Sequence, residues 1–253
     1  MKIIIGVPAY KRPNLLFAHT HYTHKYLKPA LEAKGFDVTY MVVGSSDVEA
    51  NVIHKFDEIE YYEIPNVLSH KKNFIHNQAK IKDVDFLFWL DSDDFIPVSL
   101  LIKSIEVANQ NGYWSSVTNM FTYDSHTQRI IHFDGYSSRN SLKNQGLGTC
   151  RTYTKQLLKK LPLDVYGYNR NSGMDGLMLP HLMQIPVAPQ DRLITTPPER
   201  TLIGIKTSQN IWQIKDFNPA EISVLDLNLK NDIFSWLDLE IKDLILNIDT
   251  KNP

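Results

Sequence analysis

The densest group of chemically capable residues in this sequence is the acidic cluster Asp91-Ser92-Asp93-Asp94. It directly follows an almost wholly apolar run, residues 85–90, which predicts a buried strand that delivers the acids at its carboxyl end. Three carboxylates beside a buried strand are electrostatically costly unless a cation lies among them. Carboxylate oxygens are hard ligands that suit Mg²⁺ or Mn²⁺, and these ions usually complete their shell with substrate phosphate.

Acidic clusters of this kind also occur in proteins of other classes. Asp and Ser are common at helix N-termini, where they cap backbone groups and match the helix dipole. An EF-hand is excluded, because the glycine at the turn and the glutamate at the twelfth position are both missing. A phosphatase that forms an aspartyl-phosphate has its acidic strand first in the domain, whereas here three predicted strands precede it. The metal site and the helix cap both stay open.

The elements that must hold this cluster alternate along the first half of the chain. Predicted strands cover residues 2–7, 36–43 and 60–64, and predicted helices cover residues 14–33, 69–82 and 98–111. Pro13 stands at the start of the first helix, and Gly35 and Gly112 stand just past helix ends. This alternation predicts an α/β fold in which helices wrap a mainly parallel sheet. Ligands bind such sheets at the carboxyl ends of the strands, where the acids stand.

The pattern changes after residue 112. Antiparallel strands are expected over residues 114–123 and 128–133, a further strand over 147–153, and helices over 154–161 and 173–183. Four prolines within residues 186–198 predict an ordered loop or linker. Residues 221–248 have helical apolar spacing, which predicts a helical tail that packs on its own domain or joins a second subunit in a homo-oligomer. The predicted segments are therefore 1–112, 113–215 and 216–253.

The composition narrows the class of protein. The chain has 253 residues, 43% hydrophobic and 22% charged, which is typical of a globular protein. No apolar run reaches the roughly 20 residues that span a bilayer, and the N-terminus leads into a strand rather than a signal peptide, so a cytoplasmic location is expected. The single cysteine, Cys150, excludes an internal disulfide and a thiolate-rich zinc site. A formal net charge of -1 demands neither a nucleic acid nor a membrane surface as partner.

Three segments, in the right order, resemble the family 2-like GT-A glycosyltransferases. Residues 3–13 (IIIGVPAYKRP) resemble the family's opening strand and its Pro-Thr-Tyr-Asn-Arg loop, and residues 86–94 (FLFWLDSDD) resemble its metal-binding strand end. Between them, Lys71-Lys72-Asn73 is similar to the family's Arg-Asn. The resemblance covers about the first 110 residues. It implies a Rossmann-like mixed sheet flanked by helices, and transfer of a sugar from a nucleoside-diphosphate sugar.

The resemblance implies roles for residues around the acidic cluster. Segment 1–112 would bind the donor: the loop Pro8, Ala9 and Tyr10 would contact its base and ribose, with Asp91 on the ribose or on an outer-shell water. Asp93, with Asp91 as second candidate, would ligate Mn²⁺ or Mg²⁺, and the ion would stabilise the charge that develops on the diphosphate. The further expected donor-binding residues are Arg12, Ser92, Lys72 and Lys206.

Two features depart from the family pattern or extend it. The family's second strand usually ends in a pair of acids, one of which reads the base; this sequence lacks the pair, and Asp47 is the shifted candidate. Lys72 is either a diphosphate ligand or a surface lysine. Residues 204–212 occupy the region where the family keeps a mobile loop, so Lys206 would neutralise the leaving diphosphate as that loop closes.

An inverting transferase needs a carboxylate that takes the proton from the attacking acceptor. The position matching the family's base is Asp175, at the start of a predicted helix in segment 113–215, which would also bind the acceptor. The acid that usually precedes the base is replaced by Met174, and a simple helix cap is the alternative for Asp175. A different class stays open too: a noncatalytic GT-A-like module that binds nucleotides or sugars and acts through its C-terminal helices.

The acceptor is the least determined partner. The short form resembles small stand-alone transferases often encoded by bacteriophages, some of which glycosylate modified bases in DNA. A phosphate-tracking surface could be formed by a set of lysines on predicted helices: Lys71, Lys72, Lys80, Lys82, Lys155, Lys159 and Lys160. The alternative acceptor is a glycan, a lipid-linked sugar or a protein.

Overall fold

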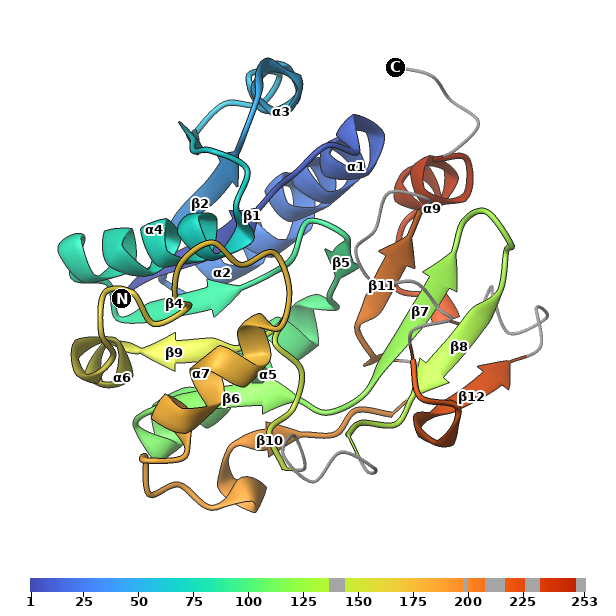
Figure 1. The fold of residues 1–253 in the computed structure, drawn as a ribbon. Coiled ribbons are helices and arrows are strands. Elements are labelled where there is room, and N and C mark those ends of the chain that lie inside the picture. The colour runs from blue at the N-terminus through green and yellow to red at the C-terminus, as the bar shows by residue number, and fades with distance from the viewer. Residues whose placement is uncertain (137–143, 198–199, 208–216, 226–232, 249–253) are drawn as a thin grey trace.

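The computed structural model of the chain describes residues 1–136, 144–197, 200–207, 217–225 and 233–248. Within these residues a seven-stranded sheet forms the larger layer (Figure 1). Its strands in spatial order are β10 (Leu193–Ile194), β6 (Trp114–Val117), β9 (Thr152–Thr154), β4 (Phe86–Trp89), β1 (Lys2–Pro8), β2 (Asp37–Gly44) and β3 (Ile59–Glu63). The neighbours β4, β1, β2 and β3 run parallel, and β9 runs antiparallel to both β4 and β6.

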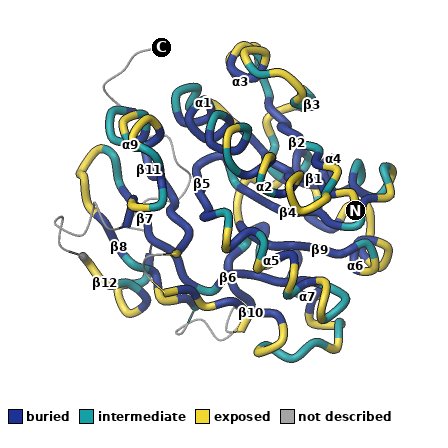
Figure 2. The backbone as a smooth tube through the Cα atoms, turned by 180° about the vertical axis from the view of Figure 1, so that it is seen from behind, coloured by how far each residue is buried: buried dark blue, intermediate teal, exposed yellow. Residues whose placement is uncertain are grey.

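Helices cover both faces of this sheet, which explains why its central strands are apolar on both sides. Ile3 and Ile5 of β1 belong to one buried cluster, and Ile4 belongs to the other. The first face carries α1 (Pro13–Tyr22), η1 (Thr23–Leu27), α2 (Lys28–Glu32), α3 (Asp47–Ile53) and α5 (Val98–Asn111). The opposite face carries α4 (Leu68–Ile81), α6 (Lys155–Lys160) and α7 (Met174–Leu182). Figure 2 shows the strands as a buried interior and the helices as part buried and part exposed.

A second sheet, five-stranded within the described residues, stands beside the first (Figure 1). Its order is β12 (Ile222–Leu225), β8 (Ile130–Phe133), β7 (Met120–Asp124), β11 (Ile203–Lys206) and β5 (Asp94–Phe95). Short 3-10 turns, η2 (Pro189–Asp191) and η5 (Pro219–Glu221), lead into β10 and β12. Helix α9 (Leu239–Leu246) packs on α1, and just beyond it the Ile248 carbonyl accepts a 3.3 Å hydrogen bond from Asn14 Nδ2.

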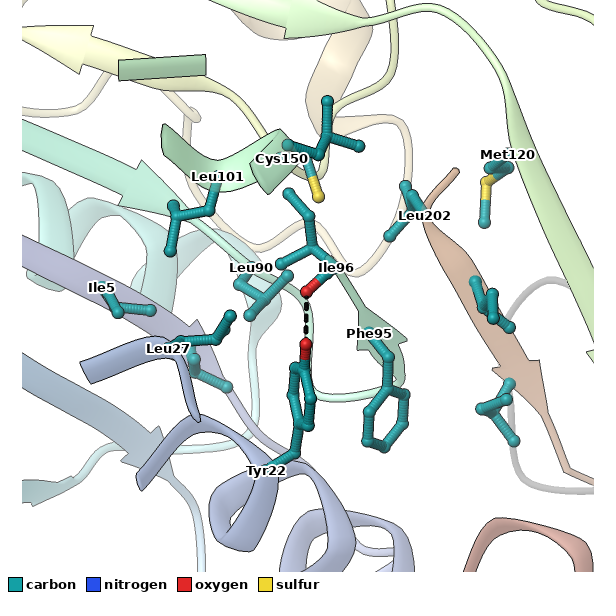
Figure 3. Packing of buried hydrophobic residues seen from close by; sticks show 14 of the residues in the cluster. Ile5, Tyr22, Leu27, Leu90, Phe95, Ile96, Leu101, Met120, Cys150 and Leu202 are labelled. Atoms are coloured by element: carbon teal, nitrogen blue, oxygen red, sulfur yellow. Dashed lines mark hydrogen bonds between the residues drawn. The ribbon is translucent and has the colours of Figure 1, made fainter. Parts of the chain in front are cut away.

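The two sheets share one hydrophobic core, seen from close by in Figure 3. Phe95 of β5, Met120 of β7 and Leu202 before β11 belong to the same buried cluster as Ile5 of β1. The only polar contact drawn in that view is a 2.7 Å hydrogen bond from the Tyr22 hydroxyl to the carbonyl oxygen of Ile96. The segment after the acidic cluster is therefore fixed on both sides by buried side chains.

The elements predicted for residues 1–112 are confirmed, with ends shifted by one or two residues. Helix α5 covers residues 98–111 as predicted, and Gly112 follows it in the left-handed region at φ +80°. The predicted first helix is continuous from residue 13 to 32 but contains the π-helical turn η1. Pro29, which lacks a backbone N–H, lies just after that turn, and such a residue disturbs the regular α-helical ladder. Helix α3 was not predicted.

The predicted strand over residues 114–123 is wrong as one element, because β6 and β7 belong to different sheets. The chain breaks at Thr118 and Asn119. The Asn119 side chain donates to Thr196 O at 2.8 Å and accepts from Thr196 N at 2.9 Å, so a side chain replaces the backbone ladder there. Asparagine is well suited to this, since its amide mimics a peptide group.

Three further expectations in the second half are corrected. The strand expected over 147–153 is only β9, Thr152–Thr154, because Cys150 before it has φ +54° and cannot continue a strand. The loop expected over 186–198 contains η2 and β10. The tail is not helical throughout: Ile222–Leu225 is β12, which completes the second sheet, and α9 is its helical part. The predicted division at residues 112 and 215 stays a prediction.

Within the described residues, no helix combines the length and the hydropathy needed to cross a membrane.

Candidate functional site

The acidic cluster lies where β4 leaves the large sheet and the chain turns into β5 of the second sheet. Leu90 N donates to Gly6 O, and Asp94 N closes a turn on Asp91 O at 3.0 Å. Because β1 and β4 are parallel neighbours, the loop after β1 emerges at the same edge as the cluster. The structure thus brings the two segments of the predicted donor site together.

Asp93 is buried and is paired with two cations from distant segments. Its Oδ2 lies 3.1 Å from Lys206 Nζ and 3.3 Å from Arg12 Nη1. Arg12 is fixed further by a 3.1 Å hydrogen bond from Nη2 to Ser92 Oγ. Burial alone would raise the pKa of Asp93, but the positive charges of Lys206 and Arg12 outweigh it and hold that pKa well below its usual value. Asp93 is therefore ionised and already neutralised by the chain.

Lys206 is the last residue of β11, which pairs with β7 and β5. Ile205 N donates to Asp93 O at 2.7 Å, which holds the strand end against the cluster. The expectation that Lys206 sits on a mobile loop is wrong, because sheet pairing fixes its backbone. Residues 208–212, the rest of that expected loop, lie outside the described residues.

Asp94 has a structural rather than a ligand-facing position. It is buried, and burial together with the neighbouring Asp93 charge raises the pKa of Asp94 well above its usual value, so its carboxyl is protonated near neutral pH. A Cβ on Gly204, opposite Asp94 in the β5–β11 pair, would come within 2.9 Å of Asp94 Oδ1. Glycine at 204 therefore leaves the room that this carboxyl occupies.

Lys72 connects the cluster to the expected base. It is buried, so the surface-lysine interpretation is wrong, and its Nζ lies 3.3 Å from Asp91 Oδ1. Burial opposes its charge, but the carboxylates of Asp91 and Asp175 outweigh this and raise the pKa of Lys72. The Lys72 ammonium thus lies in the field of both acids. Asp91 is the more open of the cluster's acids, with 35% of its side chain exposed.

Asp175 lies in the first turn of α7, with 30% of its side chain exposed. The N-cap of that helix is Gly173, so Asp175 is not the cap residue. Asp175 Oδ1 is 3.9 Å from Nη1 of the buried Arg151, and the carboxylate lies against Gly148, where a Cβ would come within 1.7 Å of it. The carboxylate is held in place and still reaches solvent.

The loop after β1 has the exposed ring expected of a base-stacking residue. Pro8 ends the strand, and Ala9 N donates to Val43 O at 2.9 Å. The Tyr10 side chain is left outside, 38% exposed, with Lys71 Nζ 5.2 Å from the centre of its ring. Lys71 is buried, donates to the Ala9 carbonyl oxygen, and has its pKa lowered to about 8 by that burial.

Asp47 is not brought to the site. It is exposed on the first turn of α3. The acid that reaches the loop after β1 is Glu49, which is fully buried and accepts from Lys11 N and from Ser46 Oγ. The Ser46-to-Glu49 spacing is the sequence signature of a capping box, a signal that could have directed attention to Glu49. Arg151 was also missed, and no short-range signal marks it.

The lysines expected to track DNA phosphates do not form an open surface. Lys71 and Lys72 are buried. Lys82 pairs with Glu60 at 2.7 Å, and Lys155 pairs with Asp83. Lys80 Nζ donates to the Leu161 carbonyl oxygen at 2.6 Å, and of this set only Lys159 and Lys160 are classed as exposed.

The arrangement of the acids does not fit the predicted divalent ion well. An ion bound to Asp93 Oδ2 would approach Lys206 and Arg12, and at about 4 Å each cation would repel it by roughly 8 kcal/mol at an effective dielectric constant of about 20. Within the described residues no group of three or more His, Cys, Asp or Glu side chains could hold a metal. The acids predicted to ligate Mn²⁺ or Mg²⁺ are instead paired with Arg12, Lys206 and Lys72.

The fold and site define an α/β protein of the GT-A type, with acids at the carboxyl end of a central strand. No protein-family model and no curated protein sequence matches the chain. The structure is similar to that of Staphylococcus aureus TarS 1–349, with a TM-score of 0.55 and 14% identity over 81% of this chain and 60% of that one. This chain therefore spans 60% of the TarS fragment. At that identity the likeness shows the fold alone.

Two other similar structures have lower scores. TarS 1–349 in complex with UDP gives a TM-score of 0.49 at 16% identity, covering 81% of this chain and 61% of that one. The 4-diphosphocytidyl-2C-methyl-D-erythritol synthase from Anaerococcus prevotii gives 0.47 at 12% identity, covering 93% and 96%.

Proposed function

We propose that this chain is an inverting glycosyltransferase that moves a sugar from a nucleoside-diphosphate sugar to a hydroxyl of an acceptor. The observation that carries the proposal is the position of Lys72 in the field of both Asp91 and Asp175, which puts the candidate base beside the predicted donor site. The GT-A type of fold and the exposed ring of Tyr10 at the same sheet edge support it.

In the proposed reaction the acceptor oxygen attacks the anomeric carbon of the donor. The bond from that carbon to the diphosphate oxygen breaks, and its electron pair leaves with the diphosphate. The acceptor proton passes to the Asp175 carboxylate, which Arg151 holds at 3.9 Å. The ammonium of Lys72 lies where it would stabilise the negative charge that develops on the diphosphate.

We propose a glycan hydroxyl rather than a DNA base as the acceptor. The reason is the burial and pairing of the helix lysines: Lys71 and Lys72 are buried, and Lys82 and Lys155 are paired with acids, which leaves few cations to contact a phosphate backbone. For the donor, UDP and UDP-GlcNAc are the first compounds to test, since TarS 1–349 has been crystallised with each.

The proposal is tested with Asp175→Asn, comparing UDP binding by calorimetry with release of UDP from UDP-GlcNAc, water serving as the acceptor. We expect UDP affinity to stay near the wild-type value and UDP release to fall by at least about 10²-fold, the usual contribution of a general base. Asp191→Asn is the control, since Asp191 is an exposed acid on η2.

The outcomes separate an enzyme from the alternative, a noncatalytic binding module. If the wild type binds UDP but releases no product from any donor of a nucleoside-diphosphate sugar panel, the module is the better description. If Asp175→Asn releases UDP as fast as the wild type, Asp175 is not the base.

A further inference from the structure

The candidate donor site carries its own counter-cations. Arg12, at the start of α1, and Lys206, at the end of β11, converge on one oxygen atom, Oδ2 of Asp93, at 3.3 and 3.1 Å. We propose that Arg12 and Lys206 neutralise the donor diphosphate directly, in the place where a divalent cation was predicted, so that donor binding needs no metal. This inference rests on the proposed function, because it concerns the same donor.

Both cations are fixed in position before any ligand arrives. Lys206 is 9% exposed and its backbone is held between β7 and β5, with the additional bond from Ile205 N to Asp93 O. Arg12 has a left-handed backbone, φ 59°, which turns the chain from β1 into α1, and its guanidinium is anchored to Ser92. Cations held in this way lose little conformational freedom when they bind an anion.

In this arrangement Asp93 serves to hold the two cations rather than to ligate a metal. Bringing two positive side chains close together is unfavourable unless an anion lies between them, and Asp93 Oδ2 is that anion in the structure. A diphosphate has the same charge sign with more oxygen atoms, and the planar guanidinium of arginine matches phosphate geometry. A divalent cation at the same oxygen would instead be repelled by both groups.

The remaining cations of the site lie on the same side of the acidic cluster. Lys72 pairs with Asp91, and Lys71 lies below the ring of Tyr10 at the loop after β1. These groups extend the positive side chains from the cluster toward the proposed base-stacking residue. The chain therefore offers cations along the length expected of a nucleoside diphosphate.

The test is calorimetric titration of UDP into the whole protein, once in excess EDTA and once with Mn²⁺. We expect the same affinity in both buffers. Lys206→Met should weaken UDP binding in EDTA by about tenfold or more, the loss of one charge-assisted contact of at least 1.4 kcal/mol. Lys206→Arg should restore part of it, which also guards against a variant that fails to fold.

The matched control is Lys28→Met. Lys28 is buried like Lys206, 8% exposed, and is paired with Glu58 on the α2 side of the molecule, outside the site. It should leave UDP affinity unchanged. Asp93→Asn sharpens the comparison: a residue that only holds the cations should keep UDP binding in EDTA, whereas a metal ligand should lose it in Mn²⁺.

Each other outcome has a definite meaning. UDP that binds only with Mn²⁺, or a Lys206→Met variant that binds as well as the wild type in EDTA, overturns the inference and leaves the proposed function standing. If neither UDP nor any other nucleoside diphosphate binds in either buffer, the proposed function fails and the inference fails with it.

Discussion

Single residues in this site act in pairs, and each pair joins segments far apart in the chain. Lys206 and Asp93 are 113 residues apart and both are largely buried. Removing one partner of such a pair leaves an uncompensated buried charge, which commonly costs about 3–5 kcal/mol of stability. Variants of the pair must therefore be checked for folding before their binding is interpreted, which is why a charge-conserving substitution accompanies Lys206→Met.

Gly148 is the residue whose side chain matters most by being absent. A Cβ there would come within 1.7 Å of Asp175 Oδ1, so Gly148→Ala must displace the carboxylate. Because a misplacement of about 1 Å can cost about 10²-fold in rate, we expect UDP release from UDP-GlcNAc to fall strongly while UDP affinity is kept.

Steady-state kinetics and calorimetry of Gly148→Ala measure the two effects separately. Gly176→Ala is the matched control, since nothing lies within 4 Å of the Cβ it would add. Unchanged turnover in Gly148→Ala would show that the carboxylate does not act from the place the structure gives it.

At the level of elements, the site depends on how closely α4 packs on β1. This helix carries Lys71 and Lys72, and β1 leads into the loop with Tyr10. The close approach is made at Gly6 of β1, where an added Cβ would come within 2.5 Å of Ile75 Cγ2 on α4. The helix that supplies the cations is thus seated on a glycine.

A pair of glycine substitutions tests this packing. Gly6→Ala should lower the free energy of unfolding by about 1–3 kcal/mol, the usual cost of overpacking a core. Gly176→Ala, inside α7 with open space around it, should raise it by about 0.5–1 kcal/mol, because alanine is the better helix former. Urea unfolding measures both, and equal effects of the two variants would contradict the close contact between β1 and α4.

At the scale of the whole molecule, the shared core ties the two sheets together around the site. One buried cluster includes side chains of β1, β7, β11 and the tail, among them Ile241 of α9. Two histidines are completely buried in this framework: His19 on α1 and His76 on α4. Both are kept neutral in the folded protein, so their burial makes stability depend on pH.

The sign of that dependence follows from the pKa values. Burial lowers the pKa of His19 to about 4 and that of His76 to about 3, from 6.5 in an unfolded chain. Below pH 6.5 the unfolded state takes up protons that the folded state does not, so stability is present above pH 6.5 and falls as the pH drops toward 4. Each histidine should contribute about 1.4 kcal/mol per pH unit in that window.

Urea unfolding at several pH values between 7 and 4.5 measures the slope. His76→Leu should make it shallower by the contribution of one histidine, and His126→Leu, at an exposed turn position, should leave it unchanged. An identical slope in the wild type and in His76→Leu would mean that His76 is not buried neutral.

The sequence by itself determined the first half of the fold and the position of the acids. The apolar run before Asp91, the helix ended by Gly112 and the proline at the start of α1 are local signals, and each is confirmed. They could be read because strand burial and helix ends are set by residues within a few positions of one another. The expectation that the acids need positive charge among them also follows from the sequence.

Only the tertiary structure decided which residues supply that charge. Lys206 reaches Asp93 because β11 pairs with β5, and Arg151 reaches Asp175 because α7 packs over the segment before β9. The split of residues 114–123 between two sheets depends on Thr196, 77 residues beyond Asn119. These contacts join side chains that carry no mark of one another in the sequence, since their distances are set by the packing of the two sheets rather than by local spacing.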